Sequence, residues 1–400
     1  MFRKTNDCGP EYKETIDANR NLNTVLPRPT YLVIATHHIG GAEKRFLRIW
    51  LELKKRDEPN LRLIINPELM QRVCGLTELQ DLQEYSTSIL THVVCGSFRK
   101  DLVSLREFAN QCLESSVFHF VLLPPIIRAN KHKYIYSMPA SSFAQLNWKG
   151  IVSVLLGFCR SDLVDVLSPS VLRLTKRLFL WKRRKFTLTP GSFVDLSHYE
   201  ESPFQERKND LVFLGLLSRE KQADRLFYCL PELHRGLLER GHKHITYRFI
   251  GRPSDHFDLK SLLESDPRFR EVPIEVGFHQ NPMEILRTSK VFFSVQRSDN
   301  YPSKSLLEAM ACGNQVVVTD VGDSDLIAPR KTCYYVPLDF NASDLIPICS
   351  KILEMNSVEF SSRTDENKKH IEKNFCLARS LDYFLSLYSV PPPHSSVDAG

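Results

Sequence analysis

The chain of 400 residues lacks any long hydrophobic run. Its apolar stretches are much shorter than the roughly 20 residues that a membrane-spanning helix needs. Residues 1–29 are polar and charged, and they lack the apolar segment of a secretory signal peptide. The sequence therefore predicts no transmembrane helix, and we expect residues 1–29 to form an N-terminal extension.

Paired cysteines are also missing. Ten cysteines are scattered along the chain without a Cys-x-x-Cys pair, and several lie inside apolar runs, where a thiol acts as a small hydrophobic group: Cys74, Cys95, Cys159 and Cys312. This pattern argues against a disulfide framework and a structural zinc site. It favours the reducing cytoplasm, with contact at the inner face of the membrane as one option.

Several familiar catalytic patterns are absent. The sequence contains no Gly-x-Ser-x-Gly elbow, no His-Glu-x-x-His pair, no Walker loop and no Gly-x-Gly-x-x-Gly turn. Serine hydrolases, zinc proteases and nucleotide-binding folds that depend on these patterns therefore find no support.

Positive charge is present but unevenly spread. The formal net charge is +6, from 53 basic and 47 acidic residues. The segment Arg173–Lys185 reads RLTKRLFLWKRRK and mixes seven basic residues with Leu, Phe and Trp. It is typical of an amphipathic helix on an anionic membrane, or equally of a solvated helix face that packs through its leucines. A nucleic-acid patch is the weakest interpretation, because no binding module accompanies the segment.

Apolar strand patterns alternate with helical ones along most of the chain, which indicates parallel sheets with helices on both faces. The predicted strands include Ile89–Cys95, Val117–Val121 and Gln315–Thr319, and a helix is predicted over Ser343–Met355 with Ser343 as its N-cap. A Pro-Gly-Ser break after Thr189 and a polar stretch to Asp210 suggest a domain boundary. We expect two doubly wound α/β domains, at 30–190 and 210–374, joined by a linker at 191–209. A C-terminal helix at 375–390 and a disordered Pro-rich tail at 391–400 complete the prediction.

The stretch Ser298–Asp325 carries the most information. Pro302 ends a strand, because proline cannot donate to a sheet ladder. Ser303, Lys304 and Ser305 then form the first turn of a helix, where free N–H groups, a cation and two hydroxyls suit an anion. The helix carries Glu308, ends at Gly313 and leads into the apolar run Gln315–Thr319.

This stretch resembles the donor-site motif of glycosyltransferase family four, the group 1 type, which has the GT-B fold. The resemblance implies two domains that face each other across a cleft, with the acceptor on the N-terminal side and a sugar nucleotide on the C-terminal side. In the family two glutamates flank seven residues: the second binds the ribose and the first contacts the transferred sugar. Here Glu308 matches the second position and Asn300 occupies the first. Taken alone, Glu308 would be interpreted as an ordinary solvated carboxylate on a helix.

Two further segments resemble the family. Gly40-Gly41-Ala42-Glu43 matches a segment that reaches toward the donor diphosphate, although a simple strand-to-helix turn is the alternative. The run Leu211–Lys221 matches a turn whose arginine and lysine hold the diphosphate. Lys221 fits the lysine, whereas Leu216 replaces the arginine. Candidate substitutes for that arginine are Arg219, Lys304 and Arg297.

Histidines complete the candidate site. The family has a histidine near the end of a strand beside the transferred sugar, and the resemblance assigns His119 this catalytic role. A buried strand histidine held by hydrogen bonds is the alternative. His279 follows another strand, where it would touch the nucleobase or the sugar. His37 and His38 lie on a predicted cleft loop and are weaker candidates.

Asp323-Ser324-Asp325 has the spacing of a metal-binding pair found in glycosyltransferases of the other main fold. Both aspartates also suit the first turn of a helix, and Asp325 fits a glutamate that family four often has here. We therefore predict no metal ion and no cofactor other than the nucleotide sugar as co-substrate.

The resemblance as a whole implies a retaining glycosyltransferase. It would move a sugar from a UDP- or GDP-linked donor to a glycan or lipid-linked acceptor, as in surface-polysaccharide synthesis. We expect no nucleic-acid partner. The alternative is a non-catalytic GT-B subunit that binds a sugar nucleotide or glycan, since Asn300 and Leu216 replace charged family residues. A GT-B epimerase is the third option.

Overall fold

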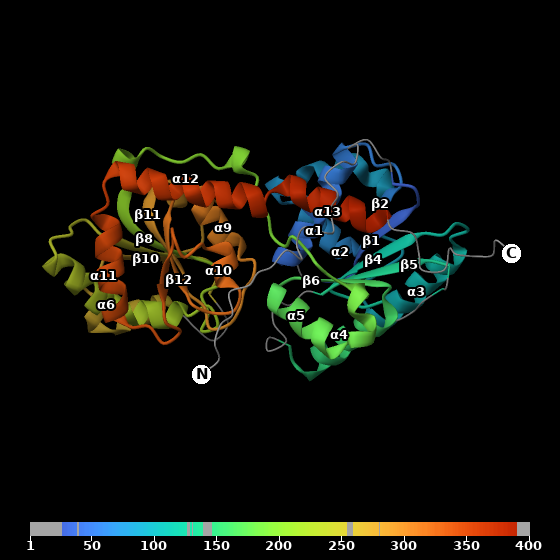
Figure 1. Ribbon diagram of the computed structural model, residues 1–400, viewed down its shortest axis with the longest axis horizontal. Helices are drawn as coiled ribbons and strands as arrows, with labels where there is room; N and C mark the ends of the chain where they lie inside the picture. Colours follow the sequence, from blue (N-terminus) through green and yellow to red (C-terminus); the bar gives the residue numbers. More distant parts are fainter. Residues whose placement is uncertain are drawn as a thin grey trace.

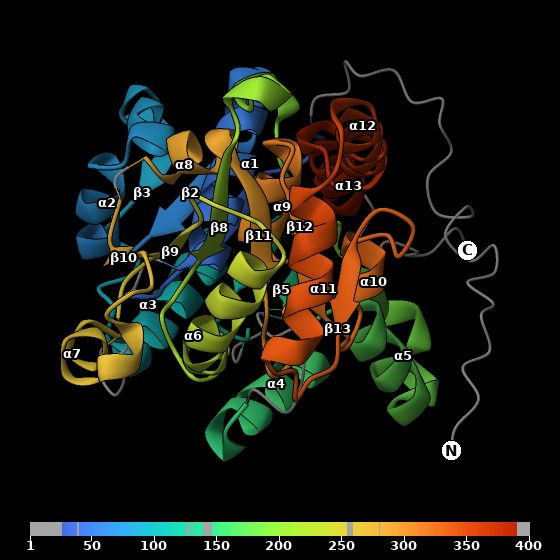
Figure 2. The same ribbon diagram turned by 90° about the vertical axis from the view of Figure 1, so that its left-hand side faces the viewer.

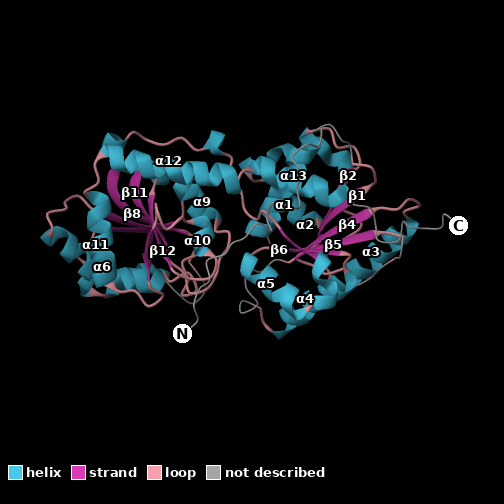
Figure 3. Cartoon of the chain, viewed as in Figure 1, coloured by secondary structure: helices cyan, strands magenta, loops and turns pink. Residues whose placement is uncertain are grey.

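The computed structural model describes residues 26–37, 40–125, 129, 131–138, 146–253, 259–279 and 281–389. These residues form two α/β domains side by side, each a parallel sheet with helices on both faces (Figure 1). Figure 3 shows the two sheets enclosed by helices. The expected tail at 391–400 and residues 1–25 of the expected extension lie outside the described residues. Leu26 is buried, and its backbone N–H donates to Glu58 Oε2 at 2.9 Å, so the end of that extension packs on the first domain.

The N-terminal sheet has the order β3-β2-β1-β4-β5-β6-β7. Its strands are β1 (Thr30–Ile34), β2 (Leu61–Ile65), β3 (Ile89–Leu90), β4 (Val117–Val121), β5 (Lys133–Ser137), β6 (Leu163–Val166) and β7 (Phe186–Leu188). Its helices are α1 (Gly41–Lys55), α2 (Pro67–Cys74), α3 (Phe98–Gln111), α4 (Trp148–Arg160) and α5 (Pro169–Leu178), with 3-10 segments η2 (Thr77–Ser88) and η4 (Leu180–Lys185).

The C-terminal sheet has the order β10-β9-β8-β11-β12-β13. Its strands are β8 (Lys208–Leu214), β9 (Thr246–Ile250), β10 (Ile274–Gly277), β11 (Ser289–Ser294), β12 (Gln315–Thr319) and β13 (Tyr334–Val336). The helices are α6 (Ala223–Glu239), α7 (Leu259–Ser265), α8 (Pro282–Thr288), α9 (Lys304–Ala311), α10 (Ser324–Ile327), α11 (Ala342–Leu353), α12 (Ser357–Asn374) and α13 (Leu377–Ser389).

Mostly apolar strands lie at or close to the positions that the sequence predicted. Every residue of β1, β4 and β12 is buried, as expected for strands covered on both faces. The bounds of β4 and β12 agree with the predicted ones. The short edge strand β13 was not predicted, because three residues are too few to show the hydrophobic alternation that distinguishes a strand from a loop.

One predicted helix cap is wrong. The sequence suggested Ser343 as the N-cap of the helix near 343–355. In the structure α11 begins at Ala342, and Asn341 is the N-cap, whose side-chain oxygen accepts the Ser343 N–H at 2.8 Å. Asparagine is among the best N-cap residues, so the earlier position is the stronger one.

The C-terminal helix returns to the first domain. α12 lies along the second domain, and α13 continues toward the first (Figure 1). Leu381, Phe384 and Leu387 of α13 are buried in the core that α1, β1 and β2 form. The end of the chain therefore links the two domains by hydrophobic packing.

None of the described helices is long and apolar enough to cross a membrane.

Candidate functional site

The strand order of each sheet reverses at one point, and the candidate residues gather there. In the first sheet β1 pairs with both β2 and β4, and in the second β8 pairs with both β9 and β11. Ligands of open α/β sheets bind outside the carboxyl ends of the strands at such switch points. Gly40 and Gly41 follow β1, Lys221 follows β8, and the N-terminus of α9 follows β11.

Lys221 is held at the end of the second sheet by a residue that the sequence analysis did not single out. Its Nζ donates to Gln296 Oε1 at 3.0 Å, and the Gln296 N–H donates to Thr319 Oγ1 at 3.0 Å. Burial lowers the pKa of Lys221 to about 8, partly offset by the charge of Glu220. The ammonium group is thus fixed and poorly solvated, which suits it to an anionic ligand.

The loops after β8 and β11 are joined to each other. The Arg297 N–H donates to the Glu220 carbonyl at 3.0 Å, and the Ser298 hydroxyl donates to the Glu220 carboxylate. Among the candidate substitutes for the missing arginine, Arg219 is exposed, and Arg297 pairs with Asp224 at 3.9 Å. Leu216 itself is half exposed.

The start of α9 has the predicted form. Ser303 is the N-cap, and its Oγ lies 3.4 Å from Ser305 Oγ. One turn later, Glu308 Oε1 lies 3.6 Å from Lys304 Nζ and accepts a hydrogen bond from the Tyr199 hydroxyl at 3.3 Å. Tyr199 belongs to the interdomain segment, and no signal in the sequence pointed to it, because 109 residues separate it from Glu308.

Gly40 and Gly41 open α1 on the first domain. Glu43, three residues into the motif, accepts the Gly40 N–H at 3.0 Å and the Thr36 hydroxyl at 3.1 Å. The helix therefore caps its own first turn through Glu43. A side chain at Gly41 would meet no atom within 4 Å, so the backbone there faces open space.

Asn300 lies in a loop that touches the first domain on one side and the interdomain linker on the other. The neighbouring Asp299 accepts from the Ser170 hydroxyl at 3.4 Å, and Pro302 packs against Gly191. Asp323 reaches the same helix α5, accepting the Ser170 N–H at 2.7 Å. The sequence analysis did not foresee these contacts, which join the candidate donor loop to the other domain.

The Asp-x-Asp pair does not converge on one point. Asp323 is buried and holds Ser170 and Arg173 of the first domain, the latter at 3.1 Å. Asp325 is exposed on α10. Within the described parts of the chain, no group of three His, Cys, Asp or Glu residues could hold a metal ion.

His119 lies in the core of the first domain rather than beside a sugar site. It is fully buried in the middle of β4, with Nδ1 at 2.9 Å from the Tyr388 hydroxyl and Nε2 at 2.6 Å from Ser137 Oγ. Burial, with the charges of Arg45 and Lys133, lowers its pKa to about 3. This is the buried strand histidine that the sequence left as the alternative, so we do not retain His119 as a catalytic candidate.

His279 is exposed on the loop after β10. The preceding Phe278 is 62% exposed, and the Arg252 guanidinium lies 5.4 Å from the centre of its ring. Both follow strand ends of the same sheet. An exposed aromatic face beside a cation suits a flat heterocycle, a feature that the sequence analysis missed. His37 Nδ1 lies 3.6 Å from Glu68 Oε2. His38 lies outside the described residues.

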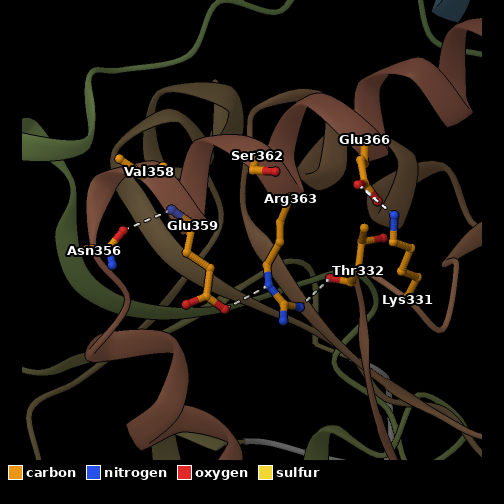
Figure 4. Close-up of a pocket in the computed structure, with 8 residues that line it drawn as sticks. All are labelled: Lys331, Thr332, Asn356, Val358, Glu359, Ser362, Arg363 and Glu366. Atoms are coloured by element: carbon orange, nitrogen blue, oxygen red, sulfur yellow. Dashed lines mark hydrogen bonds and ion pairs between the residues drawn. The ribbon is translucent and has the colours of Figure 1, made fainter.

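A separate hollow of about 570 Å³ lies between α12 and the loop before β13 (Figure 4). Its lining residues are Lys331, Thr332, Asn356, Val358, Glu359, Ser362, Arg363 and Glu366. The charges pair with each other, Lys331 with Glu366 at 2.9 Å and Arg363 with Glu359 at 3.2 Å. This hollow contains none of the predicted site residues.

The two switch-point sheets and the C-terminal crossing helix define a GT-B fold. Residues 208–354 match the family model Glycosyl transferases group 1. The family resemblance and the α/β fold class predicted from the sequence are thereby confirmed.

Solved structures show the same fold over nearly the whole chain. HepE of Anabaena in complex with UDP and glucose is 13% identical, with a TM-score of 0.66, over 90% of this chain and 99% of that one. A glycosyltransferase from Rickettsia africae (14%, TM-score 0.64) covers 90% and 98%. Sucrose-phosphate synthase of Thermosynechococcus elongatus (13%, TM-score 0.63) covers the same shares. No curated protein matches the sequence.

Proposed function

We propose that this protein is a retaining glycosyltransferase that transfers a sugar from a nucleotide-diphosphate sugar. The observation that carries the proposal is the grouping at the β8/β11 switch point. There a partly buried lysine, Lys221, and the N-terminus of α9 with Glu308 occupy neighbouring strand ends. UDP is the first nucleotide to test, because HepE has been solved with UDP and glucose.

Glycosyl transfer would require the site to stabilise the negative charge of the departing diphosphate. Free N–H groups at the start of α9, the hydroxyls of Ser303 and Ser305, and the cations Lys221 and Lys304 supply positive potential there. Glu308, oriented by Tyr199, would accept hydrogen bonds from the ribose. Gly40 and Gly41 would approach the diphosphate from the other domain.

The sugar end of the site has fewer candidates. Asn300 stands where the family glutamate contacts the sugar, and an amide offers both a donor and an acceptor to sugar hydroxyls. His279 and Phe278 lie on the loop that would meet the nucleobase. The acceptor hydroxyl would lose its proton to the leaving phosphate, so the reaction requires no separate protein base.

The acceptor side of the proposal concerns the first domain. We infer a glycan or lipid-linked acceptor, used in the cytoplasm for surface-polysaccharide synthesis, with peripheral membrane contact through residues 173–185. The basic, leucine-rich sequence of that segment supports the membrane contact. The unpaired cysteines support the reducing compartment.

Two substitutions test the donor site. Glu308→Ala and Lys221→Ala should each lower the affinity for UDP at least about tenfold, because each removes a charged contact of about 1.4 kcal/mol or more. They should also abolish release of UDP from the UDP-sugar that the protein uses. Thermal stabilisation by UDP and GDP identifies the base, since bound ligand raises the unfolding temperature.

Matched controls come from the hollow between α12 and the loop before β13, where the charged side chains pair with each other. Glu366→Ala and Lys331→Ala make the same changes of charge away from the switch point. Both should bind UDP as the unchanged protein does. Full transferase activity in Glu308→Ala and Lys221→Ala would refute the assignment.

A non-catalytic nucleotide-sugar or glycan binder is the second candidate. Leu216 and Asn300 favour it, because both replace charged residues of the family pattern. This candidate predicts that UDP-sugars stabilise the purified protein without hydrolysis and without transfer to any acceptor. Release of UDP that depends on an added acceptor would exclude it.

A further inference from the structure

The outer face of α4 carries apolar side chains where a solvated helix carries polar ones. The exposed residues of α4 include Trp148, Ile151, Val152, Leu155 and Leu156. Their spacing of three and four places them on one side of the helix. Val154 and Phe158 of the same helix are buried in the domain core. α4 is therefore apolar on its solvent face as well as on its packed face.

This face continues onto the neighbouring segments. Nine of the eighteen exposed large hydrophobic residues in the described parts of the chain fall within residues 148–181. The four beyond α4 are Leu174, Leu178, Leu180 and Trp181, on α5 and η4. Phe179 joins the segments, with its ring 5.6 Å from that of Phe158 and 6.0 Å from that of Trp181. α4 and α5 lie at the same lower end of the molecule in two perpendicular views (Figures 1 and 2).

The charge around this face has one sign. Nine basic residues lie on α4, α5 and η4. Arg173 pairs with Asp323, and Lys185 donates to the Ser161 carbonyl. The other seven are Lys149, Arg160, Lys176, Arg177, Lys182, Arg183 and Arg184. Residues 146–188 contain two carboxylates, Asp162 and Asp165, and both are buried. An apolar stripe beside cations, without exposed acidic groups, is complementary to an anionic lipid surface.

We propose that α4, α5 and η4 together form a docking face for an anionic membrane, with the α4 stripe entering the headgroup region. This docking face includes the whole of α4 in addition to the 173–185 segment. It lies on the domain proposed to bind the acceptor. The proposal rests on the proposed function in one respect: it makes a lipid-linked acceptor the substrate class for that domain.

Tryptophan fluorescence gives a direct readout. The chain has three tryptophans. Trp50 is buried, whereas Trp148 and Trp181 are 71% and 77% exposed on the docking face. Vesicles of phosphatidylcholine with phosphatidylglycerol should shift the emission to shorter wavelength, and lipids brominated on their chains should quench it. Trp148→Phe should remove most of the quenching if α4 enters deepest.

Co-sedimentation with the same vesicles measures the binding. Ile151→Ser with Leu155→Ser, and separately Arg183→Glu with Arg184→Glu, should each weaken binding at least tenfold. Phe98→Ser with Val103→Ser is the matched control, since these α3 residues are 52% and 55% exposed elsewhere on the domain. The control should bind as the unchanged protein does.

Several results would overturn the proposal. They are no binding to anionic vesicles, binding that the docking-face variants retain, and a solution dimer that these variants convert to monomers. Failure here is distinguishable from failure of the proposed function, because the residues proposed to bind UDP lie outside the docking face. UDP should stabilise the docking-face variants as much as the unchanged protein.

Discussion

At the scale of single residues, Lys221 couples burial to charge. Burial lowers its pKa from the ordinary 10.5 to about 8, so the folded protein holds this proton less firmly than the unfolded chain. The charged form is therefore unfavourable in the ligand-free fold below pH 8, and its cost is relieved as pH rises through 8. A bound diphosphate would reverse this preference, because opposite charge raises the pKa of an ammonium group.

The affinity for UDP should consequently depend on pH. We expect tight binding near pH 7 and a progressive loss between about pH 8 and pH 10, as the free protein gives up the Lys221 proton. Lys221→Arg should remove this loss, because arginine stays charged over the whole range. Titration calorimetry at several pH values measures both. Equal pH profiles for the two proteins would show that Lys221 does not contact the diphosphate.

Tyr199 offers a second test at this scale. Its hydroxyl donates to Glu308, and Tyr199→Phe removes that donor while keeping the ring. We expect UDP affinity to fall about three- to tenfold, in line with a net hydrogen-bond contribution of about 0.5–1.5 kcal/mol. The turnover of saturated enzyme should change little, because Tyr199 positions a binding residue and does not touch the sugar. A lower turnover with unchanged affinity would contradict this role.

The sequence could single out Lys221 and Glu308 as candidates because each matches a position in a motif of the family that the chain resembles. It could not identify their partners. Gln296 is 75 residues from Lys221, and Tyr199 is 109 residues from Glu308. No local period connects such pairs, since they meet only when β8, β11 and the linker take their places in the fold.

At the scale of elements, the strand ends of the second sheet fit together through glycine. Gly251 follows β9 with φ +156, and a Cβ there would lie 1.7 Å from the Gly215 carbonyl oxygen. The Gly215 N–H donates to the Ile250 carbonyl at 3.0 Å, so the two strand ends approach closely. This approach sets the path of the loop that carries Lys221.

Gly251→Ala should therefore destabilise the C-terminal domain. The backbone conformation alone costs about 1–3 kcal/mol for a residue with a side chain, and the contact with Gly215 adds to it. Gly277→Ala, at the end of the adjacent β10, is the control, because a Cβ there meets no atom within 4 Å. Urea unfolding compares the two variants, and similar midpoints would argue against the close approach.

Elements with strong periods were predicted well, and weak ones were not. β4 and β12 are mostly apolar and fully buried, and their predicted bounds agree with the structure. β3 was predicted to be seven residues long at 89–95 and has two. It is an edge strand beside β2 alone, and edge pairing depends on the neighbouring chain more than on the strand's own residues.

At the scale of the whole molecule, two carboxylates of the second domain meet helix α5 of the first. Burial, together with the nearby charge of Asp323, raises the pKa of Asp299 to about 6. Because this lies above the ordinary 3.8, the folded state retains a proton that the unfolded chain loses. The resulting stabilisation is greatest at low pH and is lost as pH rises through about 6.

The variant Asp299→Asn should flatten this part of the pH dependence. We expect the unchanged protein to lose about 1–2 kcal/mol between pH 4 and pH 7 from this group, after allowance for its partial exposure. The variant should lose correspondingly less and be the more stable of the two at pH 7. Thermal unfolding across pH provides the comparison. Asp339→Asn, an exposed carboxylate on the same domain, should leave the profile unchanged.

The sequence by itself determined the alternation of strands and helices, because this alternation follows from local periods, caps and turn residues. The GT-B fold class and the candidate donor motif were inferred from the resemblance of Ser298–Asp325 to a known family. Only the tertiary structure decided that His119 is enclosed by Tyr388 and Ser137, and that Asp299 and Asp323 hold the other domain. It also decided that the apolar residues of α4 face solvent beside a basic segment. Whether a side chain is buried, paired or exposed depends on residues far away in the chain, and folding alone brings them together.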